Sequence, residues 1–430
     1  MLKIIRILLL MGLLGAAFIA TEVQAATSRI DVLQVEGSIN PVLVDYIERG
    51  IDQAEEDGAI ACIIQMDTPG GLDTSMRDIV KEIVSAKVPV VIYVSPSGSR
   101  AASAGVFITM AAHIAVMAPN TAIGAAHPVA IEGELPEGME EKVVNDAAAY
   151  IRSIAEAHGR NMEWAERAVR ESVSATEEEA LELNVIDMVA FDLDSLVSQL
   201  DGWQVTMLDG TVVTLHTQGA TINHIKMSWV EGFLYAIADP NIAYILYTLA
   251  LLGLMVEITT PGIGVPGIAG GICFILAFYS LGLLPVNYAG VVLIVIAFGL
   301  FIAEVFTPTF GLFTAGGITS LVIGSLILFR GGPAMRVSIP LIIGVTIVIA
   351  ALFGFVIQRA LKAHRRQATT GREELVGKSA IVKVTLEPQG TILHEGELWT
   401  AVLDEGRAES GEEVIITKFD GLKLYVTKKQ

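Results

Sequence analysis

The second half of the chain contains a long stretch with almost no charge. Between Asn241 and Ile357 the only charged residues are Glu257, Glu304, Arg330 and Arg336. Such a segment cannot form the surface of a water-soluble fold, and a membrane-crossing helix needs about 20 apolar residues. We therefore expect a helical transmembrane domain over residues 241–358, with four or five spans. The five candidate spans are 241–257, 263–284, 288–306, 311–329 and 339–358.

Two parts of this region repeat each other. Residues 257–261 read Glu-Ile-Thr-Thr-Pro, residues 304–308 read Glu-Val-Phe-Thr-Pro, and a glycine-rich helix start follows each copy. The repeat indicates a duplicated two-helix unit, in which small residues allow close helix packing. Glu257 and Glu304 are either functional intramembrane charges or caps at span ends. We favour the cap.

The flanks of the chain predict its orientation in the membrane. Lys3, Arg6 and the apolar run 7–20, followed by Val23-Gln24-Ala25, are typical of a signal peptide over residues 1–25. A retained first helix is the alternative. A basic linker over residues 359–372 follows the last span, so this end is expected to be cytoplasmic. We predict a multi-pass protein of the plasma or inner membrane, with residues 26–226 on the exported side and the C-terminal domain in the cytoplasm.

Residues 26–226 predict an α/β domain. The strand-like runs 30–35, 59–66 and 89–94 alternate with the helical runs 41–55 and 73–85. This order is typical of a parallel sheet covered by helices. Such folds place their functional residues in the loops after the strands.

Two further segments complete the predicted organisation. Residues 227–240 carry Trp229, Phe233 and Tyr235 and form an interfacial linker helix or a core helix of the soluble domain. Residues 373–430 predict a small all-β barrel of the OB type. Its five expected strands are 380–386, 391–393, 398–402, 413–417 and 423–427.

Composition excludes several classes of function. The net charge of −19 argues against a nucleic-acid-binding protein, which needs a basic face. The two cysteines, Cys62 and Cys273, lie in different predicted domains. They therefore predict neither a disulfide nor a cysteine-based zinc site.

Ser103 is the candidate nucleophile of the first domain. It lies in Ala-Ala-Ser-Ala-Gly, residues 101–105, between a strand and an expected helix. A helix N-terminus offers free backbone N–H groups, and Gly71 and Ala104 are candidate donors to an oxyanion. A serine also needs a base. Residue type alone leaves Lys142 and His127 open, and each element taken singly is more often a packing or turn residue.

Four motifs in order resemble the NfeD family of membrane-bound serine proteases, of the Clp-protease class and also called stomatin operon partner proteins. The motifs are residues 67–71, 102–105, 120–128 and 142–147, and the resemblance extends over the whole chain. It implies a crotonase/Clp-protease-like first domain and an OB-fold C-terminal domain. It implies Ser103 as nucleophile, Lys142 as general base and Gly71 and Ala104 as oxyanion donors. His127 is the alternative base, and no metal or organic cofactor is implied.

The resemblance also implies a function and partners. The expected activity is that of a serine endopeptidase with a Ser–Lys dyad, cleaving hydrophobic segments such as the C-terminal region of a stomatin-type protein. The alternative is a membrane scaffold for stomatin- or flotillin-like proteins with little proteolysis. A crotonase-type acyl-CoA enzyme shares the expected fold, but export and the lack of a carboxylate pair argue against it. By analogy with the class, we expect a homo-oligomer, at least a dimer.

Overall fold

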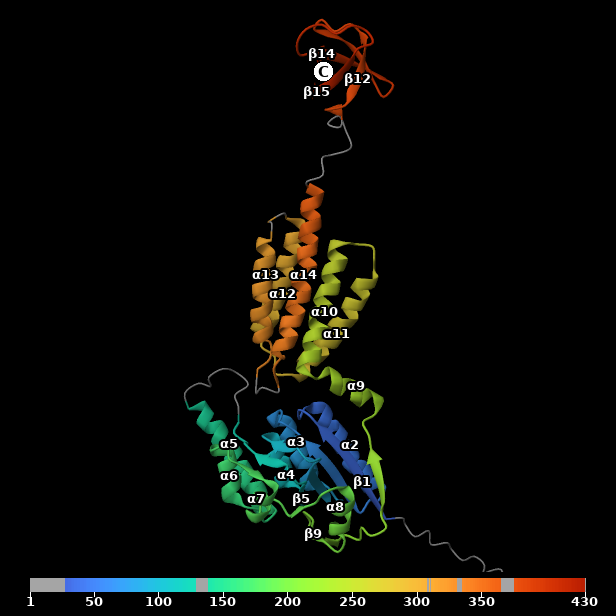
Figure 1. The fold of residues 1–430 in the computed structure, drawn as a ribbon. Helices are drawn as coiled ribbons and strands as arrows, with labels where there is room; N and C mark the ends of the chain where they lie inside the picture. The colour runs from blue at the N-terminus through green and yellow to red at the C-terminus, as the bar shows by residue number, and fades with distance from the viewer. Residues whose placement is uncertain are drawn as a thin grey trace, which may run out of the picture. The chain divides into compact units, whose positions relative to one another are not determined.

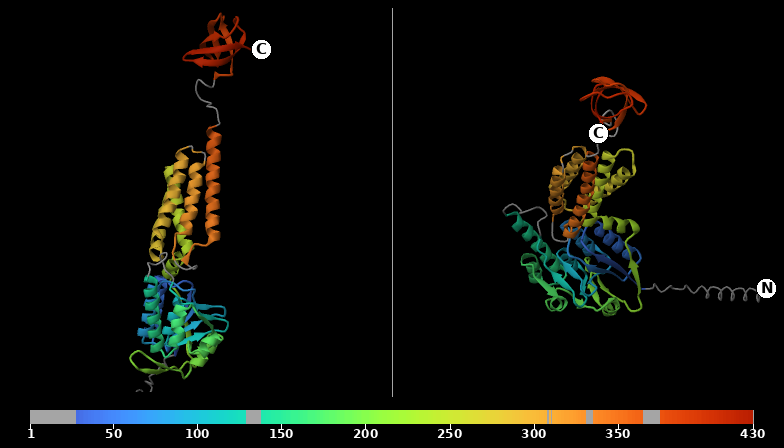
Figure 2. Two further views of the ribbon diagram at one scale, coloured as in Figure 1. Left: turned by 90° about the vertical axis from the view of Figure 1, so that its left-hand side faces the viewer. Right: turned by 45° about the horizontal axis from the view of Figure 1, so that its top comes forward.

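The computed structural model describes residues 28–128, 138–307, 309, 311–330, 335–364 and 375–429. The predicted signal peptide and most of the predicted basic linker lie outside these residues. Figure 1 shows an α/β domain, a group of long helices and a small β-domain along the chain, and Figure 2 gives two further views. The three parts correspond to the predicted α/β, transmembrane and C-terminal domains.

The first domain is built on a six-stranded parallel sheet, as the sequence predicts. The strand order is β11-β1-β2-β3-β5-β8. The strands are β1 (Arg29–Glu36), β2 (Ala61–Asp67), β3 (Val90–Val94), β5 (Ile114–Met117), β8 (Met188–Val189) and β11 (Thr221–Ile225). All five pairings between neighbours are parallel.

Helices bury one face of this sheet. They are α2 (Pro41–Glu56), α3 (Asp73–Ser85), α4 (Ala104–Ala111), α5 (Met139–Ala157) and α6 (Met162–Arg170). Because successive strand residues point to opposite faces, Ile64 packs under these helices while Ile63 packs on the other side. The second face is covered by α8 (Leu193–Leu200) and the hairpin of β9 (Gln204–Thr206) and β10 (Val212–Thr214). This hairpin turns around Asp209-Gly210.

A second, small sheet lies beside the main one. It has the order β4-β6-β7, from β4 (Arg100–Ala102), β6 (Ala122–Gly124) and β7 (Ser174–Thr176). A capping box at Thr176 starts α7 (Glu177–Glu182), with Glu179 bonded back to the Thr176 backbone. This sheet matters for function because β4 leads directly into Ser103.

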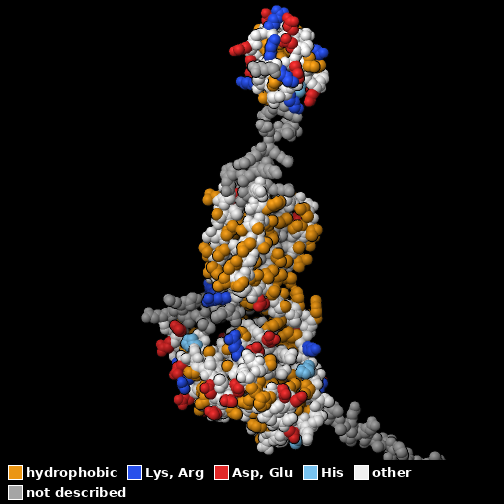
Figure 3. Space-filling view, in the orientation of Figure 1, with side chains coloured by type: hydrophobic (Ala, Val, Ile, Leu, Met, Phe, Trp, Pro, Cys, Tyr) orange, Lys and Arg blue, Asp and Glu red, His pale blue; other side chains and the backbone are white. Residues whose placement is uncertain are grey.

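Five helices occupy the predicted transmembrane domain: α10 (Pro240–Thr259), α11 (Val265–Leu283), α12 (Tyr288–Phe306), α13 (Leu312–Leu326) and α14 (Ile339–His364). In the described part of the chain, the first three are long and apolar enough to cross a membrane. The apolar helical segments 312–326 and 339–355 are shorter. Figure 3 shows hydrophobic side chains dominating the visible surface of these helices. Because α14 continues to His364, the first residues of the predicted basic linker are helical.

The repeated sequence forms two helical hairpins, α10–α11 and α12–α13. Within each hairpin the two helices pack against each other at glycines. A Cβ at Gly253 of α10 would lie 2.8 Å from the Cα of Gly270 in α11, and one at Gly290 of α12 would lie 2.9 Å from the carbonyl oxygen of Gly324 in α13. These distances leave no room for a side chain at either position. The small residues therefore set the close packing of both hairpins.

Both intramembrane glutamates cap the helix that follows them. Glu257 Oε2 accepts a hydrogen bond from Gly264 N–H at 3.1 Å, and Glu304 Oε2 accepts one from Thr314 N–H at 3.0 Å. A carboxylate at a helix N-terminus satisfies an otherwise unpaired N–H and interacts favourably with the helix dipole. The capping interpretation is confirmed for both residues.

The C-terminal domain is a closed five-stranded barrel, as predicted. Its strand order is β12-β13-β14-β16-β15. The strands are β12 (Ser379–Val384), β13 (Gln389–His394), β14 (Glu397–Leu403), β15 (Glu413–Asp420) and β16 (Lys423–Lys428). Inward-facing aliphatic residues such as Val382 and Ile392 form its core. Closure leaves no unpaired sheet edge.

The structure also shows the segment of the expected linker helix and the state of the two cysteines. The expected linker helix is α9 (Trp229–Ile237), which begins with a capping box of Ser228 and Glu231. Cys62 and Cys273 are both free thiols, so the expectation that they form no disulfide is confirmed.

Candidate active site

Ser103 occupies a strained turn between β4 and α4. Its backbone has φ 53° and ψ −113°, a conformation that side-chain-bearing residues rarely adopt. Such strain costs about 1–3 kcal/mol and is found most often at functional sites. The turn is fixed from both sides: Ser103 N–H donates to the Gly124 carbonyl at 3.3 Å, and the Ser103 carbonyl accepts from Val106 N–H at 3.1 Å. The side chain is half-buried.

Small residues surround the Ser103 hydroxyl. Gly70 has φ +118°, and a Cβ built on it would lie 2.7 Å from Ser103 Cβ and 3.1 Å from Ser103 Oγ. At the second residue of α4, a Cβ on Gly105 would lie 2.7 Å from Thr68 Cγ2. Thr68 in turn accepts a hydrogen bond from Gly70 N–H at 3.0 Å. The glycines therefore let the loop of residues 67–72 approach the serine closely.

The loop of residues 67–72 is held between two other segments. On one side, Thr68 pairs with Ala101 of β4 in a parallel bridge, and Asp67 Oδ1 accepts from Arg100 N–H at 3.0 Å. On the other side, Ile39 pairs with Gly71 in a second parallel bridge. Ser103, the 67–72 loop and the segment around Ile39 thus form one hydrogen-bonded unit.

This pairing points the Gly71 N–H away from Ile39. The bridge uses the Gly70 carbonyl, which accepts from Ile39 N–H at 2.9 Å, and Leu72 N–H, which donates to the Ile39 carbonyl at 3.0 Å. In a parallel bridge of this kind, the central residue directs its own N–H to the opposite side. Within the described residues, neither Gly71 N–H nor Ala104 N–H has an acceptor. Both sequence-predicted donors are therefore free to bind an oxyanion.

Lys142 lies in the first turn of α5, and its side chain is exposed. Asp146 and Tyr150 lie one and two turns further along the same helix face. Asp146 is 2.6 Å from Arg77 of α3, and the centre of the Tyr150 ring lies 4.5 Å from the Arg77 guanidinium. Tyr150 also stacks on Phe107 of α4, with the ring centroids 6.0 Å apart. Lys142 therefore lies at the N-terminal end of the helix face that packs toward α3 and α4. The described contacts do not include one between Lys142 and Ser103.

His127, the alternative base, follows β6 by three residues and is half-buried. Its Nδ1 lies 2.8 Å from the Val169 carbonyl oxygen. Because a carbonyl only accepts, we assign the ring proton to Nδ1, which leaves Nε2 as the proton acceptor. The described contacts place His127 near α6 and do not include Ser103. The structure thus orients His127 but brings neither base candidate into contact with the nucleophile.

Several residues that build this site have no role in the sequence predictions. Thr68 orients Gly70, Ile39 orients Gly71, and Arg77 joins α3 to α5. The motif at residues 67–71 was the one signal that pointed to this loop. Arg77 and Ile39 carried no sequence signal, since their roles depend on contacts between distant segments.

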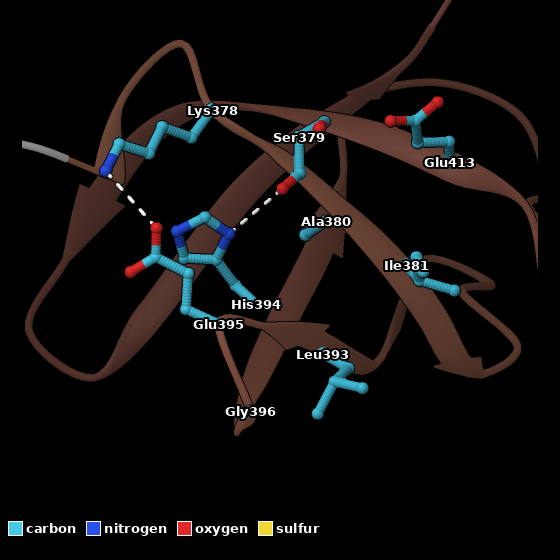
Figure 4. Close-up of a pocket in the computed structure, with 9 residues that line it drawn as sticks. All are labelled: Lys378, Ser379, Ala380, Ile381, Leu393, His394, Glu395, Gly396 and Glu413. Carbon is cyan, nitrogen blue, oxygen red and sulfur yellow. Dashed lines mark hydrogen bonds and ion pairs between the residues drawn. The ribbon is translucent and has the colours of Figure 1, made fainter.

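The described residues form a pocket on the barrel but no cluster of metal ligands. A pocket of about 460 Å³ lies on the barrel, where His394 Nδ1 is 2.9 Å from the Ser379 carbonyl and Lys378 Nζ is 3.5 Å from Glu395 (Figure 4). None of the sequence-predicted catalytic residues lines it. Among the described residues, no three His, Cys, Asp or Glu side chains form a cluster able to hold a metal ion.

Comparison with known protein families gives matches along most of the chain. Residues 29–222 match the family described as NfeD1b, N-terminal domain. Residues 241–359 match the NfeD integral membrane domain, and residues 372–428 match the NfeD-like C-terminal, partner-binding domain. The chain thus combines an α/β domain with a serine at a strained turn, an integral membrane domain and a five-stranded barrel. Together these three domains define a class of membrane protein.

Known relatives identify that class. The chain is 39% identical over 434 residues to the membrane-bound protease PH1510 of Pyrococcus horikoshii, covering 98% of both chains. It is 28% identical over 443 residues to membrane protein NfeD1b of Bacillus subtilis, covering 97% of this chain and 96% of that one. A solved structure titled as the 1510-N membrane-bound stomatin-specific protease, a mutant in complex with a substrate peptide, is 36% identical. It covers 49% of this chain and 98% of its own, with a TM-score of 0.47.

The chain belongs to the NfeD family. The architecture expected from the sequence is confirmed: an α/β domain with a parallel sheet, a helical membrane domain and a small closed β-barrel. The protein is an integral membrane protein.

Proposed function

We propose that this protein is a membrane-bound serine endopeptidase in which Ser103 is the nucleophile and Lys142 the general base. The observation that carries the proposal is the strained turn at Ser103, next to two backbone N–H groups, of Gly71 and Ala104, that have no acceptor among the described residues. The relative from Pyrococcus horikoshii is named as a membrane-bound protease, which supports the same activity.

The proposed reaction is acyl transfer in two halves. Neutral Lys142 takes the Ser103 hydroxyl proton while Oγ attacks the peptide carbonyl, and the resulting oxyanion is stabilised by Gly71 N–H and Ala104 N–H. Lys142 then gives its proton to the leaving amine as the C–N bond breaks. Water attacks the acyl-enzyme in the same way, which releases the acid and restores Ser103.

The exposure of Lys142 in the free chain sets a condition on this mechanism. A lysine can act as a base only where it is shielded from water, because desolvation favours its neutral form. In the proposed mechanism, a bound substrate therefore covers Lys142 and removes its water, which favours the neutral amine.

His127 is the second candidate for the base. The specific observation in its favour is the contact of Nδ1 with the Val169 carbonyl, which leaves Nε2 as the acceptor without any desolvation. With His127 as base, Ser103, Gly71 and Ala104 keep the same roles.

The proposed substrate is an apolar segment close to the membrane, such as the C-terminal region of a stomatin-type protein. Anchoring by α10–α12 keeps the protease domain near the bilayer, and the solved relative is titled as stomatin-specific. The match of residues 372–428 to a partner-binding domain also supports the alternative of a scaffold for stomatin- or flotillin-like proteins. We further propose a homo-oligomer, at least a dimer, with the first domain on the exported side and the barrel in the cytoplasm.

Peptide cleavage by the full chain tests this function. The purified protein in detergent micelles is incubated with a peptide copied from the apolar C-terminal tail of a co-encoded stomatin. Wild type is compared with Ser103→Ala, Lys142→Ala and His127→Ala. Cleavage lost in the first two and kept in the third is the expected result. Cleavage kept in Lys142→Ala but lost in His127→Ala moves the base to His127, and no cleavage by folded wild type favours the scaffold.

A further inference from the structure

The helix α9 contacts both the membrane helices and the first domain. At its C-terminal end, the buried Ser280 of α11 donates a hydrogen bond to the Ile237 carbonyl. At its N-terminal end, Glu231 forms a two-point ion pair with Arg49 of α2, at 2.7 and 2.8 Å. Bidentate pairs of this kind fix orientation as well as distance. The helix is therefore held on both sides rather than acting as a loose tether.

The outer face of α9 is apolar and exposed. Trp229 is 83% exposed and Val230 is 54% exposed, and the Trp229 and Phe233 rings are stacked with centroids 6.0 Å apart. The occupant we assign to this face is the lipid interface, because α10 begins only three residues after α9 ends. Tryptophan and phenylalanine at such a position are typical of interfacial anchors.

The inner face of α9 contacts the segment that orients the catalytic loop. Tyr235 Oη donates a hydrogen bond to the Glu36 carbonyl, and a Cβ at Gly37 would lie 2.5 Å from Tyr235 Oη. Gly37 has φ +97°, so the chain needs a glycine there on both grounds. Burial raises the pKa of Tyr235 to about 12, so the hydroxyl remains a donor at physiological pH.

Residues 36–39 bond directly to the loop beside Ser103. Gly37 N–H donates to the Asp67 carbonyl at 2.9 Å, and Ile39 N–H donates to the Gly70 carbonyl at 2.9 Å. The second of these bonds, together with the bond from Leu72 N–H to the Ile39 carbonyl, forms the bridge that points the Gly71 N–H away from Ile39. Tyr235 is thus separated from the proposed oxyanion donor by one short, hydrogen-bonded segment.

We infer that α9 couples the membrane anchor to the catalytic loop, and that Tyr235 is a positioning residue that keeps the Gly71 N–H in the geometry for oxyanion binding. The inference rests on the proposed protease function. A displaced donor weakens transition-state stabilisation without changing substrate contacts, so it lowers kcat and leaves KM unchanged.

The test is steady-state cleavage of the stomatin-tail peptide by the full chain in lipid nanodiscs. Tyr235→Phe removes only the hydroxyl, and Tyr93→Phe is the matched control, because Tyr93 Oη likewise donates to a backbone carbonyl, that of Ala190, at 2.9 Å. We expect kcat to fall about tenfold in Tyr235→Phe with KM unchanged, since small misplacements of catalytic groups cost one to two orders of magnitude. Tyr93→Phe is expected to keep the wild-type kcat.

A double-mutant cycle with Gly37→Ala completes the test. Because the added methyl meets the Tyr235 hydroxyl, the effects of Gly37→Ala and Tyr235→Phe on kcat should be non-additive. An active wild type whose kcat stays within twofold in Tyr235→Phe, or an effect on KM alone, overturns the inference and leaves the protease proposal intact. A folded wild type that cleaves nothing overturns the protease proposal itself.

Discussion

Gly70 lies so close to Ser103 that a side chain at position 70 would overlap it, with a Cβ at 2.7 Å from Ser103 Cβ. Gly70 also has φ +118°, which costs a residue with a side chain about 1–3 kcal/mol. We predict that Gly70→Ala lowers peptide cleavage at least a hundredfold, because the loop must move away from the nucleophile.

Gly98 provides the control for this prediction. It has a similar φ of +93°, but a Cβ there would meet nothing within 4 Å. Gly98→Ala should therefore keep activity, and it should lower the thermal unfolding midpoint less than Gly70→Ala does because it carries the backbone strain without the overlap. Equal losses of activity in both variants would mean that backbone strain, and not the contact with Ser103, is responsible.

The sequence predicted the elements well because each is specified locally. Hydrophobic alternation placed the sheet strands, the uncharged stretch placed the membrane helices, and glycines separated the barrel strands. The two intramembrane glutamates were also interpreted correctly as caps, since they precede Pro/Gly breaks where the next helix starts. The small residues on both sides of Ser103, in residues 101–105, were likewise evident from the local sequence.

The spatial relation between the proposed catalytic residues could not be predicted in the same way. Lys142 and Ser103 belong to different elements, and whether they meet depends on how α5 packs against α4, which spacing does not encode. Tyr235 is a similar case: its sequence neighbours predicted an interfacial helix, but its contact with Glu36 joins positions 199 residues apart. Long-range contacts of this kind require the fold.

The capping glutamates predict a difference in stability within the membrane domain. Glu304 is 8% exposed, whereas Glu257 is only half-buried. Loss of a cap costs about 1 kcal/mol, and more where the freed N–H is shielded from water. We expect Glu304→Ala to lower the aggregation temperature in detergent more than Glu257→Ala does. The measurement is size-exclusion chromatography after heating, and the reverse order would contradict the burial argument.

Trp229 should report directly on the contact between α9 and lipid. In nanodiscs that contain bromine-labelled lipids, part of the tryptophan fluorescence of the full chain should be quenched. We expect Trp229→Phe to remove most of the quenching and Trp203→Phe, which alters the α/β domain, to leave it. Quenching that persists in Trp229→Phe would place this helix away from the bilayer.

Two half-buried histidines, His113 and His158, predict acid sensitivity of the first domain. Burial lowers the pKa of both His113 and His158 from 6.5 to about 4, and the positive charge of the neighbouring Arg160 adds to this effect. For His158, His113 lowers the pKa further and Asp187 raises it. The unfolded chain takes up these protons below pH 6.5, whereas the folded chain does so only near pH 4. Stability therefore falls as the pH drops through this window, by up to about 3 kcal/mol for each histidine.

Thermal unfolding between pH 7 and pH 4.5 measures this effect. We expect the midpoint of the first domain to fall on acidification, and His158→Gln to flatten the dependence because one of the two proton-binding groups is gone. A dependence as steep in His158→Gln as in wild type would assign the acid sensitivity to other groups.

As the proposed nucleophile, Ser103 forms a covalent bond with the substrate. The most direct test of this bond is acid quenching of the full chain during the first turnover of the stomatin-tail peptide, followed by intact-mass and peptide-mapping mass spectrometry. We predict an added mass equal to that of the N-terminal cleavage product less one water, attached at Ser103 and absent in Ser103→Ala. An acyl group on another residue, or sustained cleavage by Ser103→Ala, would contradict it.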